Sequence, residues 1–447
     1  MSTTTTDTDR GVAERAMGIG LRGLNWLAGS DLLDRIRIRK GVERALFQGT
    51  KSGFRTATVA GRTFKAAQQL GKPARQPRSK SKGLFDITPD DEQSMFQEAG
   101  RAFAEEKIRP AAKAADDERK TPPEVLAQAT ELGVAMLGVP AELGGVMEEG
   151  AATTTALIGE TLAHGDMGIA YAALAPGAVA TAIGLWGSAE QEATYLPAFT
   201  GEDVPAAALA ILEPRPLFDP LRLDTRARRA GSDWVLDGAK SLIARASECE
   251  LFLVAAEAEG VGPALFVVES GTDGLSVEDE PAMGLRPAAT GRLILEGVKV
   301  PATAILGEGK RADYVDCVNR ARIAWASLSV GTAQAVLDYV IPYVNDRQAF
   351  GEPVSNRQGV AFAVSDIGIE SSGMRLATYR AASRADQRDD FAREAAIARR
   401  LAAQKGMKIG SDGVQLLGGH GFVKEHPVER WYRDLRSAGV MEGALLV

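Results

Sequence analysis

An arginine and a phenylalanine three residues apart form a pair whose residue types point to ligand binding in this 447-residue sequence. Arg347 offers a fixed fork of donors that suits a pyrophosphate, and Phe350 offers a flat face for stacking. They precede a stretch that favours an α-helix and contains Gln358. The alternative is a surface arginine beside a phenylalanine of the core. The residue types alone leave both interpretations open.

A second candidate segment begins at Gln415 and continues into the pair Gly418-Gly419. Because glycine has no Cβ, such a pair lets the backbone approach a ligand closely. The alternative is the end of a helix and a turn, which glycines at this place equally permit.

The cysteines and histidines do not form a metal site by their spacing. Cys249 and Cys317 are far apart, and His164, His420 and His426 show no ligand spacing with acidic or sulfur partners. We therefore predict no metal and no disulfide framework. A reducing compartment, and hence cytoplasmic localisation, is the expectation.

Charge separates the first 82 residues from the rest of the chain, which has a net charge of −7. Residues 1–82 contain 17 Lys and Arg against 6 Asp and Glu, whereas the remainder contains 35 basic and 53 acidic residues. We interpret the basic part as a separate module of short amphipathic helices. It docks on an anionic membrane surface or acidic partner, or else packs on the acidic body. Nucleic-acid binding is not expected, because base-stacking aromatics are not interleaved with the basic residues. We also expect no membrane-spanning segment, because we find no apolar run of 18 residues.

The candidate residues must be positioned by two helical blocks and an intervening β block. Apolar spacing of three and four predicts helices up to about residue 200, and again at about 312–345, 357–386 and 391–416. Short apolar runs separated by glycine or acidic turns predict strands between 205 and 305. The fold class is therefore α+β, without the βαβ alternation of a doubly wound nucleotide fold. The expected domains are a basic N-terminal extension with linker, an N-terminal α domain, a middle β domain and a C-terminal α domain: 1–84, 85–204, 205–306 and 307–447.

Three segments in order resemble the acyl-CoA dehydrogenase family of flavoproteins, and the domain order is also that family's order. They are Arg347-Gln-Ala-Phe-Gly351 with Gln358, Gln415-Leu-Leu-Gly-Gly-His-Gly-Phe422, and Pro427-Val-Glu-Arg-Trp-Tyr-Arg-Asp434 leading to Met441-Glu-Gly443. Weaker similarities are Pro140-Ala-Glu-Leu-Gly-Gly145, Glu213-Pro214 and Val298-Lys-Val-Pro301. The resemblance covers about residues 87–447 and leaves the basic module outside. It implies a helical N-terminal domain, a β-barrel-like middle domain and a C-terminal four-helix-bundle domain.

The resemblance implies an FAD-dependent oxidoreductase of fatty acid metabolism that desaturates an acyl-CoA to its 2-enoyl form. It implies that Glu442 is the base that removes the α-proton while hydride leaves the β-carbon, and that Arg322 contacts CoA. A solvated helix-face arginine is the alternative for Arg322, and an exposed terminal glutamate is the alternative for Glu442. The cofactor residues that it implies, partly on a neighbouring subunit, are Arg347, Phe350, Gln358, Gln415, Gly418, Gly419 and Gly443. An electron-accepting flavoprotein is an implied partner.

The middle domain departs from the family where the flavin ring is held. Leu212 stands where the family has a threonine, and Leu242-Ile-Ala244 replaces the family's Trp-Ile-Thr or Trp-Ile-Ser segment. Each lost hydrogen bond or stacking face costs on the order of 1 kcal/mol. Ala321 stands at the other position from which some relatives supply the base, so Glu442 is the one candidate.

These departures keep three functions open. The chain is a catalytic homo-oligomer, a non-catalytic subunit that completes the flavin site of a related partner chain, or an acyl-CoA-binding scaffold. The scaffold would lie peripherally on a membrane through residues 1–82.

Overall fold

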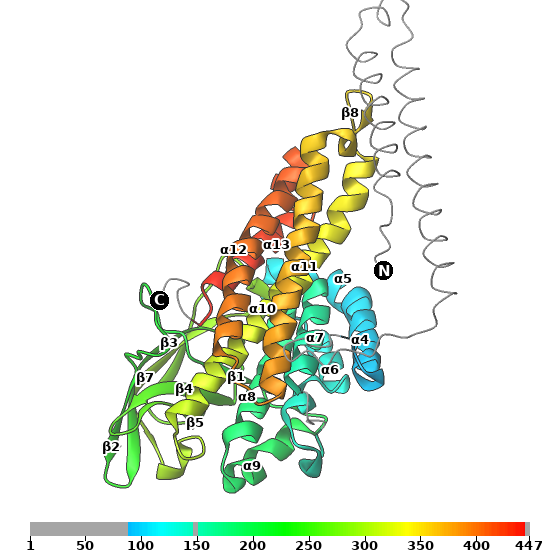
Figure 1. The fold of residues 1–447 in the computed structure, drawn as a ribbon. Coiled ribbons are helices and arrows are strands. Elements are labelled where there is room, and N and C mark those ends of the chain that lie inside the picture. Colours follow the sequence, from blue (N-terminus) through cyan, green and yellow to red (C-terminus); the bar gives the residue numbers. More distant parts are fainter. Residues whose placement is uncertain (1–87, 146–150, 443–447) are drawn as a thin grey trace, which may run out of the picture. The chain divides into compact units, whose positions relative to one another are not determined.

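The computed structural model describes residues 88–145 and 151–442 (Figure 1). The described residues all belong to one compact unit, Phe85–Val447. The predictions for the basic module, for the linker and for Gly443 lie outside the described residues. The membrane-scaffold alternative, which depends on that module, therefore stays a prediction.

Helices form the first part of the described chain, as predicted. A capping box in which Asp90 and Gln93 bond each other's backbone N–H groups begins the first helix. Ser188 and Gln191 form a second box at the start of α9. The helices are α4 (Asp91–Phe103), the π-helix η1 (Ala104–Ile108), α5 (Arg109–Glu118), α6 (Pro123–Glu131), α7 (Ala151–Gly165), α8 (Met167–Trp186) and α9 (Ala189–Tyr195), with short 3₁₀ turns η2 (Val134–Gly138), η3 (Ala141–Leu143) and η4 (Leu196–Phe199).

The expectation of no membrane-spanning segment rested on finding no run long and apolar enough to cross a membrane, and that premise was wrong for α8. This 20-residue helix meets that test by length and composition, the one helix in the described part of the chain that does. It is nevertheless a core helix: 67 % of its most apolar window is buried, and it packs on η2 and on the strand β1 (Ala207–Ala210). Buried Asp166 caps its first turn by accepting a hydrogen bond from the Ile169 N–H at 3.0 Å.

The middle part is a curled, mixed sheet. Its order is β1-β4-β2-β3-β7-β6, with β5 paired antiparallel to β4. β1 and β2 run parallel to β4, and the remaining pairs are antiparallel. Trp234, Phe252 and Phe266 are fully buried inside it. The strands are β1 (Ala207–Ala210), β2 (Arg226–Ala230), β3 (Asp233–Ile243), β4 (Leu251–Ala258), β5 (Gly262–Glu269), β6 (Leu275–Asp279) and β7 (Gly291–Val300), with 3₁₀ turns η5 (Arg286–Ala288) and η6 (Ala302–Ala304).

Long helices return after the sheet and form a bundle with α7. Gly331 lets the first of them, Arg311–Asp346, approach α7 closely, because a Cβ there would lie 1.9 Å from the backbone oxygen of Glu160. The elements are α10 (Arg311–Asp346), the hairpin β8 (Gln348–Ala349) and β9 (Glu352–Pro353), η7 (Val354–Asn356), α11 (Gln358–Asp386), α12 (Ala392–Leu417), η8 (Gly418–Phe422), α13 (Val428–Leu435) and η9 (Ser437–Gly439). The β8–β9 hairpin lies at the end of the bundle away from the large sheet (Figure 1).

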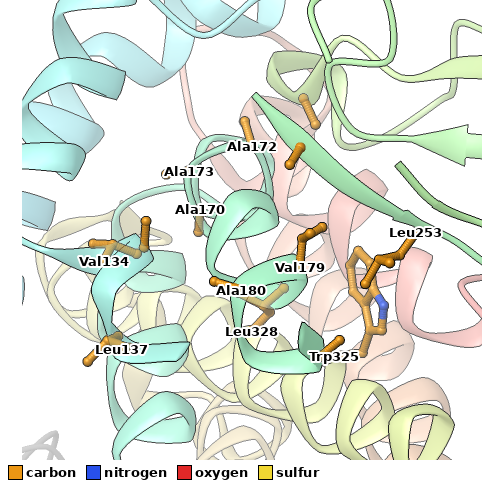
Figure 2. Packing of buried hydrophobic residues seen from close by; sticks show 14 of the residues in the cluster. Val134, Leu137, Ala170, Ala172, Ala173, Val179, Ala180, Leu253, Trp325 and Leu328 are labelled. Atoms are coloured by element: carbon orange, nitrogen blue, oxygen red, sulfur yellow. The ribbon is translucent and has the colours of Figure 1, made fainter. Parts of the chain in front are cut away.

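Apolar cores hold these parts together and confirm the α+β prediction. One core joins the N-terminal helices to β1, β4 and α10, a second lies within the bundle, and a third lies inside the sheet. Figure 2 shows the first of them, with residues from η2, α8, β4 and α10 converging on one another.

Buried ion pairs fix α13, and therefore the chain that follows it. Arg430 donates to Asp166 at 2.9 Å, and Arg433 forms a fork with Asp116 at 2.8 and 2.9 Å. Asp434 accepts from the Leu285 N–H at 2.7 Å, so α13 is also tied to the loop after β6. These bonds position the segment that ends at Glu442.

Candidate active site

A cavity of about 130 Å³ lies where α7, α8 and α10 meet the sheet. Its walls are apolar or small side chains, apart from the hydroxyls of Thr155, Thr181, Ser241 and Ser327, the Tyr171 phenol and the carboxylate of Glu442. Cavities of about 150 Å³ lined by apolar side chains hold a benzene-sized molecule. This first cavity is therefore suited to a small apolar group that ends near one carboxylate.

The Glu442 carboxylate is buried, although the residue as a whole keeps some exposure. Trp325 donates its indole N–H to Oε1 at 2.8 Å, whereas Oε2 has no hydrogen-bond partner among the described residues. Glu442 has φ 59°, a strained conformation for this residue type, and Arg399 donates to the carbonyl of Met441 just before it. The exposed-glutamate alternative does not describe this carboxylate.

Burial raises the pKa of Glu442 to about 7. Loss of solvation is the largest cause, and the positive charge of Arg399, the bond from Trp325 and the charge of Arg322 act against it. Near neutral pH this carboxyl is present in both protonation states, which suits proton transfer.

Arg322 lies on α10 one turn before Trp325 and is half-buried. Its guanidinium lies 3.5 Å from the side-chain oxygen of Asn319 and stabilises the ionised form of Glu442. It is therefore not a fully solvated arginine, and the predicted CoA contact stays a prediction.

A second cavity of about 440 Å³ opens on the other side of Leu242 and Met441, which line both cavities. Its walls come from the loop after β6, from α12 and from the segment after α13. Leu242 and Leu285, both in this wall, have φ of 52° and 55°. Positive φ is a genuine outlier for such residues and clusters at functional sites.

The predicted adenine-dinucleotide segments lie together at the far end of the bundle. Tyr343 joins them: its carbonyl accepts from the Arg347 N–H at 2.9 Å, and its hydroxyl donates to the Leu417 carbonyl at 3.3 Å. The same hydroxyl lies 2.8 Å from His420 Nδ1. The chain therefore assembles this group on its own.

This group is exposed. Phe350 is 97 % exposed, which excludes the core-phenylalanine alternative, and Arg357 lies over its ring at 5.5 Å. Arg347, Gln358 and Gln415 are exposed as well.

Gly418 and Gly419 are also exposed. Gly418 ends α12 with φ 57°, so the helix-end interpretation describes its backbone, and cofactor contact by either glycine stays a prediction.

The residues predicted to weaken the flavin wall lie around the cavities. Leu212 and Leu242 line the first cavity, and Ala244 is buried. Ser241 donates its hydroxyl to Glu280 at 2.8 Å. This wall is therefore largely apolar.

Two features of the described residues fit FAD: the volume of the second cavity, and the arginine and aromatic side chains at the end of the bundle. Ligand pockets span about 300–1,000 Å³, a range that includes the second cavity. The Leu212–Leu242 wall is where side-chain donors are fewest.

Sequence reasoning missed Trp325, Tyr171 and Arg399. One signal was available for the tryptophan: Trp325 follows Arg322 by three residues and shares its helix face. Arg399 stands in the alanine-rich run of α12, where a buried arginine is unusual. Nothing along the sequence singles out Tyr171.

Comparisons with known proteins agree with this arrangement. Models of the N-terminal, middle and C-terminal domains of acyl-CoA dehydrogenase match residues 90–203, 208–298 and 312–445. The rat mitochondrial short/branched chain specific acyl-CoA dehydrogenase is 32 % identical over 361 residues, which span 79 % of this chain and 83 % of that protein. Acryloyl-CoA reductase (NADH) of Anaerotignum propionicum is 30 % identical, over 80 % and 93 % of the two chains.

A solved structure extends the similarity to three dimensions. Butyryl-CoA dehydrogenase of Megasphaera elsdenii superposes with a TM-score of 0.75 and 27 % identity, over 81 % of this chain and 97 % of that one. The chain belongs to the acyl-CoA dehydrogenase family, whose members are FAD-dependent oxidoreductases acting on CH–CH bonds.

Proposed function

We propose that this protein desaturates an acyl-CoA thioester to the 2-enoyl-CoA, with Glu442 as the base. The observation that carries the proposal is the buried carboxylate of Glu442, one oxygen held by Trp325 and the other without a partner, at the wall of an apolar cavity.

The proposed step removes one proton and one hydride. Glu442 Oε2 accepts the α-proton, the α-carbon–hydrogen electrons form the new double bond, and hydride leaves the β-carbon. FAD, when bound, supplies the acceptor for that hydride. The buried surroundings keep water from the carboxylate and so hold its pKa near neutral. Arg322 and Arg399 favour the ionised form that begins the reaction.

The direction of the reaction needs its own test, because one relative is named a reductase. A carboxyl with a pKa of about 7 can accept a proton from a saturated thioester or donate one to an enoyl thioester. We propose oxidation, since the similar chains at 32 % identity are named dehydrogenases. An electron-accepting flavoprotein is the partner that we propose for reoxidation.

A second candidate function is that of a subunit that completes a related partner's flavin site. Two observations favour it: the exposed group around Arg347 and Phe350, and the apolar wall around Leu212 and Leu242. In this function the chain donates its exposed group and binds little flavin itself.

An absorbance spectrum of the purified full chain separates the two functions. Near-stoichiometric flavin that bleaches anaerobically with an acyl-CoA supports self-sufficient desaturation, and a panel from short to branched acyl groups defines the substrate. Glu442→Gln should keep the flavin and lose bleaching, whereas Glu425→Gln, at an exposed glutamate in the loop between η8 and α13, should behave as wild type. A folded, colourless chain contradicts self-sufficient catalysis. Recovery of flavin on adding a homologous chain would then support the second function.

A further inference from the structure

Trp325 is held from two sides inside the first core. Its indole N–H donates to Glu442 Oε1 at 2.8 Å, and its ring lies on Tyr171 with centroids 4.8 Å apart. The Tyr171 hydroxyl in turn donates to the carbonyl of Leu242 at 3.1 Å. Trp325 is only 4 % exposed, and Figure 2 shows it among the buried side chains of that core.

Several other groups face the same carboxylate. Arg322 and Arg399 bring positive charge from α10 and α12. Tyr171 from α8, with Tyr314 and Cys317 from α10, have their pKa values raised by burial and, to a smaller extent, by the charge of Glu442. These three groups therefore stay neutral at ordinary pH. Among the described residues, the hydrogen bond that Glu442 accepts on its carboxylate comes from Trp325.

We propose that Trp325 is the positioning residue for Glu442: its N–H fixes Oε1, so that Oε2 alone meets the α-proton, while its ring forms the adjoining cavity wall. The proposal rests on the proposed function. It goes further because it assigns three roles to Trp325. Its N–H orients the Glu442 carboxylate and lowers the pKa of that group, and its ring shapes the cavity. A tryptophan that only fills space would share the last role and lack the first two.

Trp325→Phe separates the roles, because phenylalanine keeps an aromatic ring and removes the N–H donor. A hydrogen bond to the charged form lowers the pKa of an acid, so its loss raises the pKa of Glu442. Oxidation needs the ionised base, and the acid limb of kcat/KM against pH should move upward. A shift of about one pH unit is expected when a carboxylate loses one such bond. Trp325→Phe should keep the acyl-chain preference close to wild type. Trp325→Leu should change both the acid limb of the pH profile and the acyl-chain preference.

A matched control is Trp234→Phe. Trp234 is fully buried in the sheet, and its indole N–H has no partner among the described residues. This variant should leave the pH profile unchanged. Thermal unfolding of both phenylalanine variants separates a shifted profile from lost packing.

A measurement without turnover tests the same bond in the full-length protein. With ¹⁵N-labelled tryptophan indoles, one resonance should titrate with a midpoint near pH 7, vanish in Trp325→Phe and stop titrating in Glu442→Gln. If the indole resonance titrates but the protein does not turn over an acyl-CoA, the proposed function is overturned, while the hydrogen bond from Trp325 to Glu442 stands. Turnover with an unshifted Trp325→Phe profile, or an indole resonance indifferent to Glu442→Gln, would overturn the inference.

Discussion

The two ends of the C-terminal bundle differ in how complete they are. Around Glu442 the chain supplies a buried carboxylate, its hydrogen-bond donor, two nearby guanidiniums and an apolar cavity. Around Arg347 and Phe350 it supplies donors and a stacking face with little around them, and Phe350 is almost fully exposed. The chain itself surrounds the first region with protein, whereas it leaves the second exposed. Mutations in the two regions should therefore have different consequences.

The largest expected effect is on turnover, in the buried region. Glu442→Gln keeps the shape and removes the base, so kcat should fall by about 10²–10⁴-fold, the usual contribution of general acid–base catalysis. Steady-state rates with the best acyl-CoA check this, with Glu425→Gln as the control. A Glu442→Gln chain that retains full turnover would remove the buried region from the chemistry.

The same residue should link stability to pH. Its folded pKa of about 7 exceeds the ordinary value of 4.5, so the folded chain binds more protons between these pH values. Stability therefore falls as pH rises through this window, by about 3 kcal/mol at most from this group. Glu442→Gln should stabilise the protein at pH 8 and have a smaller effect at pH 5.

Urea unfolding at the two pH values gives this difference directly. Asp434, whose pKa burial raises to about 8, adds a dependence of the same sign to both proteins, and comparison with the variant isolates Glu442. Equal stabilisation at both pH values would contradict a buried ionised carboxylate.

The exposed region should respond in cofactor binding and not in stability. Arg347→Ala removes a charged donor, so FAD should bind about 10–100-fold more weakly, the equivalent of one or two charge-assisted hydrogen bonds. Its unfolding temperature should stay at the wild-type value, because the side chain is exposed. Flavin titration of the apoprotein measures the affinity, with Arg393→Ala, another exposed arginine, as the control. A stability loss without an affinity loss would make Arg347 a structural residue.

The smallest effect is expected at the apolar wall. Leu212→Thr places a hydroxyl where the family has one, so FAD should bind several-fold more tightly through one hydrogen bond of about 1 kcal/mol. Without FAD the buried hydroxyl lacks a partner, and the apoprotein should be less stable by about 1–3 kcal/mol. Leu209→Thr, on the same cavity wall, is the control. Equal gains in FAD affinity for Leu212→Thr and Leu209→Thr would mean that a hydroxyl at position 212 makes no specific hydrogen bond to FAD.

The spacing of apolar residues was sufficient to predict the long helices and insufficient to predict the residues of the site. Spacing of apolar residues predicted α10, α11 and α12 within about two residues of their ends. It predicted strands between 205 and 305 without singling out β2, whose Arg226–Ala230 sequence contains no apolar run, and it did not predict the π-helix η1.

The position of Glu442 was available only through resemblance to a family. Its bond to Trp325 joins residues 117 positions apart, and neither local propensity nor spacing reports such a contact. The exposure of Phe350 was equally hidden, since a phenylalanine in isolation favours the core.

Mixed oligomers of Glu442→Gln and Arg347→Ala, assayed at an FAD concentration too low to saturate Arg347→Ala, test whether two chains share one site. We propose that, in a catalytic oligomer, one chain supplies Glu442 while another supplies Arg347 and Phe350 to the same site. Glu442→Gln and Arg347→Ala chains, unfolded together and refolded as a mixture, should regain a substantial fraction of wild-type turnover, because some sites then combine an intact base with an intact donated group. Each variant refolded alone should stay at its own low rate. A mixture no more active than the average of its two components would contradict the sharing of one site between two chains.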